Sequence, residues 1–231
     1  MPHPLLRAHP LLSSLADDLA SHPGEASPDD GRPARAAVAI VLRSQVPEIT
    51  SPAGQAEVVD RRSEVGSASL RSSLAQLDVL LIQRAEHPGD PWSGQIALPG
   101  GRQDPVDATL QDTAVRETFE ETGIDIAANG YVLGALDELR PRTPVLPPII
   151  VTPFVAVVDS DLPLGSSEEV AEAFWAPWSL FADPTSGEES TVLVHGAEWR
   201  VNSYVVGSRV VWGMTERMLR QLAARLTRLA R

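Results

Sequence analysis

Three glutamates near the middle of the chain, Glu117, Glu120 and Glu121, have the residue type and spacing of a divalent-cation site. Each residue of a helix turns by about 100°, so these carboxylates would lie within an arc of about 100° on one face. Like charges at this spacing repel one another, and a hard cation such as Mg²⁺ removes that cost. Arg116 adjoins the cluster and can hold one carboxylate in place. The alternative is a solvated acidic helix face without a ligand.

Two glycines upstream, Gly100 and Gly101, can bring the backbone close to a metal ion or a phosphate, because glycine has no Cβ. Between these glycines and the end of the glutamate cluster, the sequence predicts a helix over about 107–122, which Gly123 ends. Mg²⁺ commonly lies between protein carboxylates and substrate phosphates. The segment 100–124 is therefore a candidate site for phosphate chemistry.

Eight positions of this segment together resemble the Nudix box, the signature of the Nudix hydrolases. They are Gly101, Asp107, Arg116, Glu117, Glu120, Glu121, Gly123 and Ile124. The segment departs from the usual box in three ways: Asp107 stands where glutamate is usual, eight residues rather than seven separate it from Arg116, and Thr118 takes the first apolar position. The first two departures also occur in the coenzyme A pyrophosphatase branch of the family.

The resemblance implies an α/β/α sandwich and hydrolysis of a diphosphate bond by water, with Mg²⁺ or Mn²⁺ as cofactor. It implies Glu120 and Glu121 as the principal metal ligands, with the Gly101 backbone as a further ligand. Glu117 would bind the metal or activate the attacking water, and Arg116 would hold Glu117 in place. The catalytic residues implied are therefore Glu117, Arg116 and Glu121.

Three further acids are candidates for an auxiliary role. Asp107 lies at the start of the predicted helix. Glu168 and Glu169 belong to the segment SSEEVAEAFWAP, which resembles a stretch common in Nudix proteins, and the sequence predicts a short helix at 168–174. In the alternative interpretation, these two glutamates only stabilise the first turn of that helix.

The resemblance to the coenzyme A branch covers about residues 77–226. It rests on four segments: LLIQR at 80–84, GQIALPGG at 94–101, VTP at 151–153 and WGMT at 212–215. Two positions depart from that branch. Ala85 follows Arg84 where serine is usual, and Trp92 occupies the position of a histidine, with spacing one residue longer. These departures leave the substrate open.

Arg84, Arg102 and Trp92 are the candidate substrate-binding residues. The guanidinium fork matches phosphate oxygens, which makes both arginines candidate phosphate contacts, and the indole could stack on a base. In the alternative interpretation, the two arginines only form surface ion pairs, and Trp92 only anchors its loop by packing.

Three functions fit these features. The first is hydrolysis of coenzyme A or acyl-CoA to 3′,5′-ADP and a 4′-phosphopantetheine product. The second is hydrolysis of another nucleoside diphosphate derivative, such as ADP-ribose or a dinucleotide. The third is a non-catalytic Nudix-fold nucleotide-binding module, which the intact set of acids disfavours. The first two use the same metal site, so only substrate profiling separates them.

The elements around the site follow an α+β pattern, a mixed sheet flanked by helices. Apolar runs predict strands at 36–42, 77–82, 95–98, 131–139 and 149–158, and a hairpin of 191–194 with 200–206. Helical spacing predicts helices near 10–21 and from Met214 onward. In the latter, an apolar stripe of Met218, Leu222, Leu226 and Leu229 alternates with arginines.

Composition excludes several classes of protein. The chain of 231 residues is 43% hydrophobic, which suits one sizeable core. It has no cysteine and no lysine, so thiolate metal sites, disulfides and lysine-dependent phosphate loops are excluded. Its formal net charge of −12 disfavours nucleic acids and anionic membranes as partners. A small nucleotide is the expected partner, and a homodimer is one option for the oligomeric state.

The predicted organisation has two parts. Residues 1–34 form an N-terminal segment with a short helix and a linker, and 35–231 form the Nudix domain. A flexible insertion is predicted at 44–75, where serine, glycine, proline and charged residues lack periodicity. Prolines interrupt the first apolar run, and no run approaches the ~20 residues of a membrane span. We therefore expect a cytoplasmic protein.

Overall fold

The computed structural model describes residues 5–6, 9–28, 31, 34–45, 74–87, 92–141, 148–165, 167–183, 187–194 and 196–229. Most of the predicted insertion, 46–73, lies outside the described residues.

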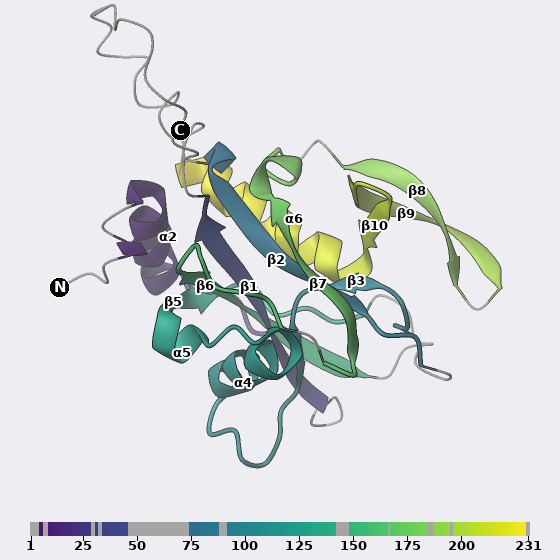
Figure 1. The fold of residues 1–231 in the computed structure, drawn as a ribbon, viewed down its shortest axis with the longest axis horizontal. Helices are drawn as coiled ribbons and strands as arrows, with labels where there is room; N and C mark the ends of the chain where they lie inside the picture. The colour runs from purple at the N-terminus through teal and green to yellow at the C-terminus, as the bar shows by residue number, and fades with distance from the viewer. Residues whose placement is uncertain are drawn as a thin grey trace, which may run out of the picture.

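A mixed sheet of seven strands forms the centre of the part of the chain that the structure describes (Figure 1). Its strands are β1 (Ala34–Ser44), β2 (Leu77–Arg84), β3 (Ile96–Ala97), β4 (Gly100–Arg102), β5 (Gly130–Ala135), β6 (Ile149–Val158) and β7 (Val170–Pro177). The order is β3-β2-β1-β6-β5, with β4 paired to β1 and β7 paired to β2. Only the β1–β6 pair is parallel among these described pairs.

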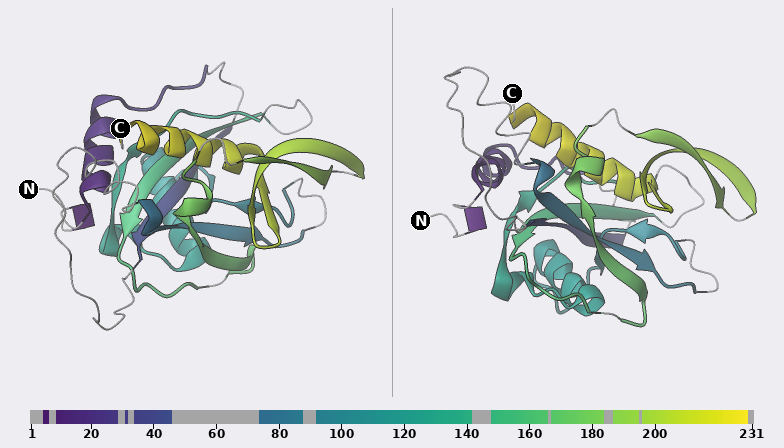
Figure 2. Two further views of the ribbon diagram at one scale, coloured as in Figure 1. Left: turned by 90° about the horizontal axis from the view of Figure 1, so that it is seen from above. Right: turned by 45° about the horizontal axis from the view of Figure 1, so that its top comes forward.

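Helices cover both faces of this sheet, as Figure 2 shows. Helices α4 (Leu110–Thr122) and α5 (Ile126–Asn129) lie on one face, and α6 (Gly213–Leu229) and α2 (Pro10–Ser21) lie on the other. The 3₁₀ helix η1 (Trp178–Leu180) follows β7. A smaller sheet of β8 (Glu188–Val194), β9 (Ala197–Val206) and β10 (Arg209–Trp212) precedes α6. None of the described helices is long and apolar enough to cross a membrane.

The central strand β1 is apolar from Ala36 to Leu42, where both of its faces are covered. Ala36, Ile40 and Leu42 belong to the core beneath α2 and α6. The residues between them, Ala37, Ala39 and Val41, belong to a second core with α4 and α5. The alternation of side chains along one strand therefore builds two hydrophobic cores, and the three-layer α/β/α prediction is confirmed.

Most of the predicted elements are confirmed, with shifted ends. The helix near 10–21 is α2, whose four leucines are buried. The hairpin is present, with both strands longer than predicted, and the C-terminal helix begins at Gly213. The predicted strand 131–139 ends at Ala135, and the predicted strand 95–98 is only Ile96–Ala97.

The predicted helix at 168–174 is wrong. Residues 170–177 form strand β7, which pairs antiparallel with β2 over nearly its whole length. The two glutamates that suggested a helix start lie in a turn, where the Val170 N–H donates to the Ser167 carbonyl at 3.4 Å. The backbone hydrogen bonds and burial gained by joining the sheet outweigh the weak local preference.

Candidate active site

Helix α4 carries the predicted glutamates and begins at a capping box. The Thr109 hydroxyl accepts from the Asp112 N–H at 3.2 Å, and the Asp112 carboxylate accepts from the Thr109 N–H at 2.8 Å. These bonds satisfy backbone donors at the helix start and explain why the helix begins three residues later than predicted. At the other end, Gly123 has φ 74° and its N–H donates to the Phe119 carbonyl at 2.8 Å. Asp107 therefore lies in the loop before the helix.

Thr118, the polar residue at an apolar position of the box, is fully buried. Its hydroxyl donates to the Ala114 carbonyl at 2.6 Å, so the polar group is satisfied within the helix. Thr122 makes the same bond to the Thr118 carbonyl at 2.6 Å. This departure from the family pattern therefore leaves α4 packed against the sheet.

Glu121 is held by the glycine pair. Its side chain is only 4% exposed, and its carboxylate accepts from the Gly100 N–H at 2.8 Å. Burial raises the pKa of Glu121 to about 7; the Gly100 hydrogen bond and the charge of Arg84 oppose this rise, and the charges of Glu117 and Glu169 add to it. A buried carboxyl among like charges favours its protonated form until a cation approaches.

Glu117 lies directly against Gly101. A Cβ on Gly101 would come within 2.4 Å of a Glu117 carboxylate oxygen. Gly100 has φ 150°, and a Cβ there would come within 2.3 Å of the Ala37 carbonyl oxygen. Strand β4 holds both glycines beside β1, with Gly101 opposite Ala37. Gly100 therefore requires glycine, because its backbone packs against that of β1, and a side chain on Gly101 would displace the Glu117 carboxylate.

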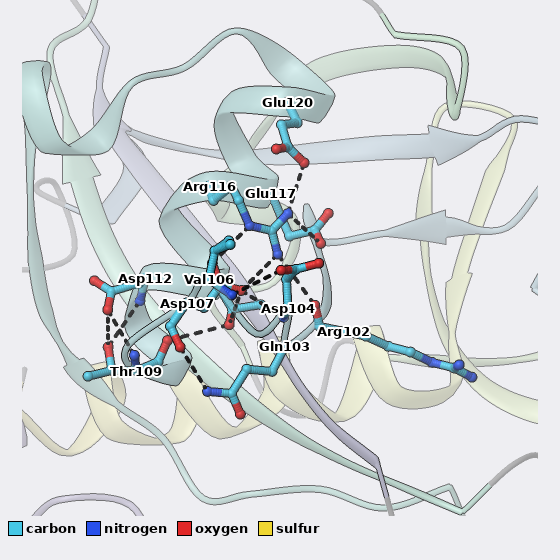
Figure 3. Close-up of polar contacts among 11 residues, drawn as sticks. Arg102, Gln103, Asp104, Val106, Asp107, Thr109, Asp112, Arg116, Glu117 and Glu120 are labelled. Carbon is cyan, nitrogen blue, oxygen red and sulfur yellow. Dashed lines mark hydrogen bonds and ion pairs between the residues drawn. The ribbon is translucent and has the colours of Figure 1, made fainter.

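Arg116 links three carboxylates, as Figure 3 shows. Its guanidinium lies 2.9 Å from Asp107, 3.0 Å from Glu117 and 2.9 Å from Glu120. The Arg116 hydrogen bond is the largest cause that holds the pKa of Asp107 well below its usual range. Burial raises the pKa of Glu117, and Arg116 opposes that rise. Asp107 also accepts from the Thr113 hydroxyl at 2.9 Å, which fixes the loop on the helix.

A cavity of about 930 Å³ opens beside α4 and contains most of the predicted site residues. Among the predicted residues, those that line it are Arg84, Trp92, Gly101, Arg102, Glu117, Glu121 and Glu169. Glu120, Arg116, Asp107 and Glu168 do not line it. The side chain of Glu120 is 55% exposed and pairs with Arg116. The structure thus brings two of the three box glutamates to the cavity, together with one acid from the turn before β7.

The donor set at this end of the cavity suits a hard divalent cation. Beside the larger effect of burial, the charge of Glu169 raises the pKa of both Glu117 and Glu121, and the charge of Glu117 adds to the rise at Glu121, so a cation among these carboxylates would relieve repulsion. Among the described residues, no three acidic or histidine side chains are placed so that they could hold one metal ion by themselves. Mg²⁺ needs no such cage, because it commonly takes one or two carboxylates and completes its shell with water and substrate phosphates.

Sequence reasoning missed the far wall of the cavity. Residues of β8–β9, including Val194, Trp199 and Val201, line it together with Met214 and Met218 of α6. These residues lie 70 or more positions after the box, and their periodicity signals only a hairpin and a helix. The WGMT segment at 212–215, which lines the same cavity, was the one available signal.

Comparison with known proteins agrees with this site. The family model described as NUDIX domain matches residues 60–193. Proteins named uncharacterized Nudix hydrolase NudL, from Yersinia pestis (strain Pestoides F) and Yersinia pseudotuberculosis serotype O:1b (strain IP 31758), are 33% identical over 150 residues, covering 64% of this chain and 72% of theirs.

A solved structure supports the fold. The MutT/nudix family protein from Enterococcus faecalis has a TM-score of 0.51 and 20% identity, covering 99% of this chain and 76% of that one. The structure thus has the Nudix-like box on α4, the glycine pair beside it and the α/β/α sandwich around them. The family model agrees with these features and matches most of the predicted domain. This chain therefore belongs to the Nudix family and is a pyrophosphohydrolase.

Proposed function

We propose that this Nudix hydrolase cleaves the diphosphate of coenzyme A or acyl-CoA, releasing 3′,5′-ADP and a 4′-phosphopantetheine product. One observation carries the proposal: all four segments that resemble the coenzyme A branch contribute residues to the same cavity as Glu117 and Glu121. Arg84, Gln95–Leu98, Val151 and Trp212–Thr215 all line it. Segments spread over more than 100 residues therefore meet at one cavity, where a single ligand can contact all of them.

Two glutamates and a glycine would hold the divalent ion. Glu121 and Glu117 supply carboxylate oxygens, and Gly101 supplies its backbone carbonyl. When bound, Mg²⁺ or Mn²⁺ supplies charge neutralisation at the diphosphate and a more acidic water. Glu120 reaches this site only by leaving Arg116, so it is the residue that we expect to move on metal binding.

Proton transfer falls to the buried carboxylates. A general base must lie within hydrogen-bond reach of the attacking water, and the carboxylates of Glu117 and Glu121 both line the cavity in which that water would lie. Arg116 is a positioning residue, because it holds Glu117 by an ion pair of 3.0 Å and does not line the cavity.

The predicted substrate contacts have different positions. Arg84 is close enough to lower the pKa of Glu121, so its guanidinium can reach a phosphate bound there. Arg102 is exposed, and its side chain points away from Arg116 in Figure 3, which suits a contact at the cavity rim. Trp92 lines the cavity and can stack on a base.

A specific observation favours a second candidate. Trp92 lies in the cavity where the coenzyme A branch has a histidine, and Ala85 adjoins Arg84. These residues could redirect the same metal site to ADP-ribose or a dinucleotide.

Product analysis separates the two candidates. The purified protein with Mg²⁺ or Mn²⁺ is incubated with coenzyme A, acetyl-CoA, ADP-ribose, NADH and diadenosine polyphosphates. We expect 3′,5′-ADP from the coenzyme A compounds, and a loss on the order of 10²-fold or more in turnover for Glu121→Gln. Faster cleavage of ADP-ribose or a dinucleotide would reject the coenzyme A proposal. Unchanged turnover in Glu121→Gln would reject this metal site.

A further inference from the structure

The outer wall of the cavity is the β8–β9 hairpin, which extends beyond the N-terminal end of α6 in Figure 1. Val194 is paired with Ala197, and Val192 with Trp199, in antiparallel register. Paired residues share one face of a hairpin, and so do residues two apart along a strand. Val194, Ala197, Trp199 and Val201 therefore present one apolar face, and all four line the cavity.

The opposite side of this region is also apolar. Met214 and Met218 come from the first turns of α6, and Ile149 and Val151 come from β6. Methionine side chains are flexible and adapt to apolar ligands of different shape. Polar residues also line this part of the cavity: Asn202 of β9, and Glu216 and Arg217 of α6. At the solvent edge, Arg200 and Glu189 form an ion pair of 3.0 Å with side chains 82% and 56% exposed. The region thus has extended apolar walls with a few polar residues and a charged rim.

A diphosphate and its metal do not account for this region. They belong with Glu117 and Glu121, and a diphosphate bound there would leave the valine and methionine walls of this region uncovered. The cavity, at about 930 Å³, lies near the upper end of small-molecule sites, so it has room for a second part of the substrate. Trp199 is 44% exposed, which leaves apolar surface open to that part.

We infer that the β8–β9 hairpin forms an apolar subsite for an aliphatic acyl chain at the end of the substrate remote from the diphosphate, with Trp199 as a specificity-determining residue. The inference rests on the proposed function and narrows it to acyl-CoA. An aliphatic chain matches the valine, alanine and tryptophan of the shared face, whereas the polar lining residues of β9, Arg200 and Asn202, belong to the other face of that strand. Each methylene buried in the subsite is expected to strengthen binding by up to about fourfold.

Steady-state kinetics with a series of substrates tests the subsite. We would measure kcat and KM for coenzyme A and its acetyl, butyryl and hexanoyl thioesters, using the wild type, Trp199→Ala and Leu193→Ala. Leu193 is the matched control, because it is on the same hairpin and 72% exposed, pairs with Glu198 on the other face and does not line this cavity.

In the wild type, we expect kcat/KM for hexanoyl-CoA to exceed kcat/KM for coenzyme A, because the KM for hexanoyl-CoA is lower. The ratio of these two kcat/KM values is the quantity to compare between variants. Trp199→Ala should lower that ratio about tenfold, and Leu193→Ala should leave it within twofold. Equal ratios in the wild type and Trp199→Ala would overturn the inference. A loss in Trp199→Ala that is the same for every substrate would also overturn it, because it indicates contact with a group that all substrates share.

A binding measurement separates failure of the subsite from failure of the proposed function. Hexanoyl-pantetheine and acetyl-pantetheine, which lack the diphosphate, are titrated into the metal-free protein by NMR. Tighter binding of the hexanoyl compound that depends on Trp199 supports the subsite, even if coenzyme A is not cleaved. Cleavage of coenzyme A compounds without any preference for the hexanoyl chain in binding or turnover would reject the subsite and leave the proposed reaction standing.

Discussion

Glu121 combines two properties that oppose each other in the metal-free protein. Its carboxyl is buried, which favours the protonated form. It also accepts a hydrogen bond from the Gly100 N–H at 2.8 Å, which favours the ionised form. Burial is the larger influence, and it raises the pKa to about 7. The ionised form that a metal requires is therefore disfavoured by the fold alone, which links metal binding to proton release.

This pKa predicts a pH-dependent stability. The carboxyl of Glu121 binds its proton more tightly when the protein is folded, with a pKa of about 7 against 4.5 for the free group. Its contribution to stability is complete below pH 4.5 and is lost as pH rises through 7. The melting temperature of the metal-free wild type should fall between pH 5 and pH 8 relative to that of Glu121→Gln, which lacks this titration.

Mg²⁺ should reverse the trend, because a cation favours the carboxylate. Its stabilisation of the wild type, measured by thermal unfolding, should be larger at pH 8 than at pH 5 and small in Glu121→Gln. Parallel pH profiles of the two metal-free proteins would contradict the raised pKa.

At the scale of elements, the turn before β7 separates two neighbouring acids. A helix at 168–174 would have placed Glu168 and Glu169 together in its first turn. In the structure, the Ala85 N–H donates to the Glu169 carbonyl at 2.9 Å, which ties the turn to the end of β2. Glu169 lines the cavity and raises the pKa of Glu117 and Glu121, whereas Glu168 does not line it.

Substitution of each acid tests this difference. Glu169→Gln should lower kcat on the order of 10²-fold, as for loss of a group that assists proton transfer or holds the metal. Glu168→Gln removes the same charge one residue away and should stay within a few-fold of wild type. Similar losses in both variants would mean that net charge, and not the position of Glu169, matters.

At the scale of the whole molecule, elements from both ends of the chain complete one core. Helix α2 contributes buried leucines beside α6, and Asp18 accepts from Arg225 at 3.0 Å and from Arg228 at 3.0 Å. The strands that flank residues 46–73 also meet directly, because Ser44 pairs with Leu77 and the Gln45 N–H donates to the Gln76 carbonyl at 2.6 Å. The described core is therefore continuous on both sides of that segment.

We predict that residues 46–72 are dispensable for the reaction. Replacing them by a short Gly-Ser linker keeps Leu74, which is buried in the core, and keeps the β1–β2 pairing. The melting temperature should change by only a few degrees, and kcat/KM by less than about fivefold, because loop length costs little free energy. An equal-length Gly-Ser replacement controls for composition. Insoluble protein, or loss of turnover in both variants, would show that the segment contributes to fold or site.

The amino-acid sequence by itself determined the parts of this protein that depend on neighbouring residues. The spacing of Glu117, Glu120 and Glu121 identified the helix and its chemistry, Gly100 and Gly101 identified the close backbone approach, and apolar runs identified the central strands. These features are local, because helix and strand periods and backbone freedom act over a few residues.

Only the tertiary structure decided which acids share the cavity, which carboxyl is buried enough to titrate near pH 7, and what forms the far wall. Glu169 reaches Glu121 across more than 40 residues of sequence, and Trp199 faces a cavity whose carboxylates lie on α4. Burial, electrostatic shifts and cavity walls arise from side chains on separate elements, so no periodic pattern within one segment encodes them.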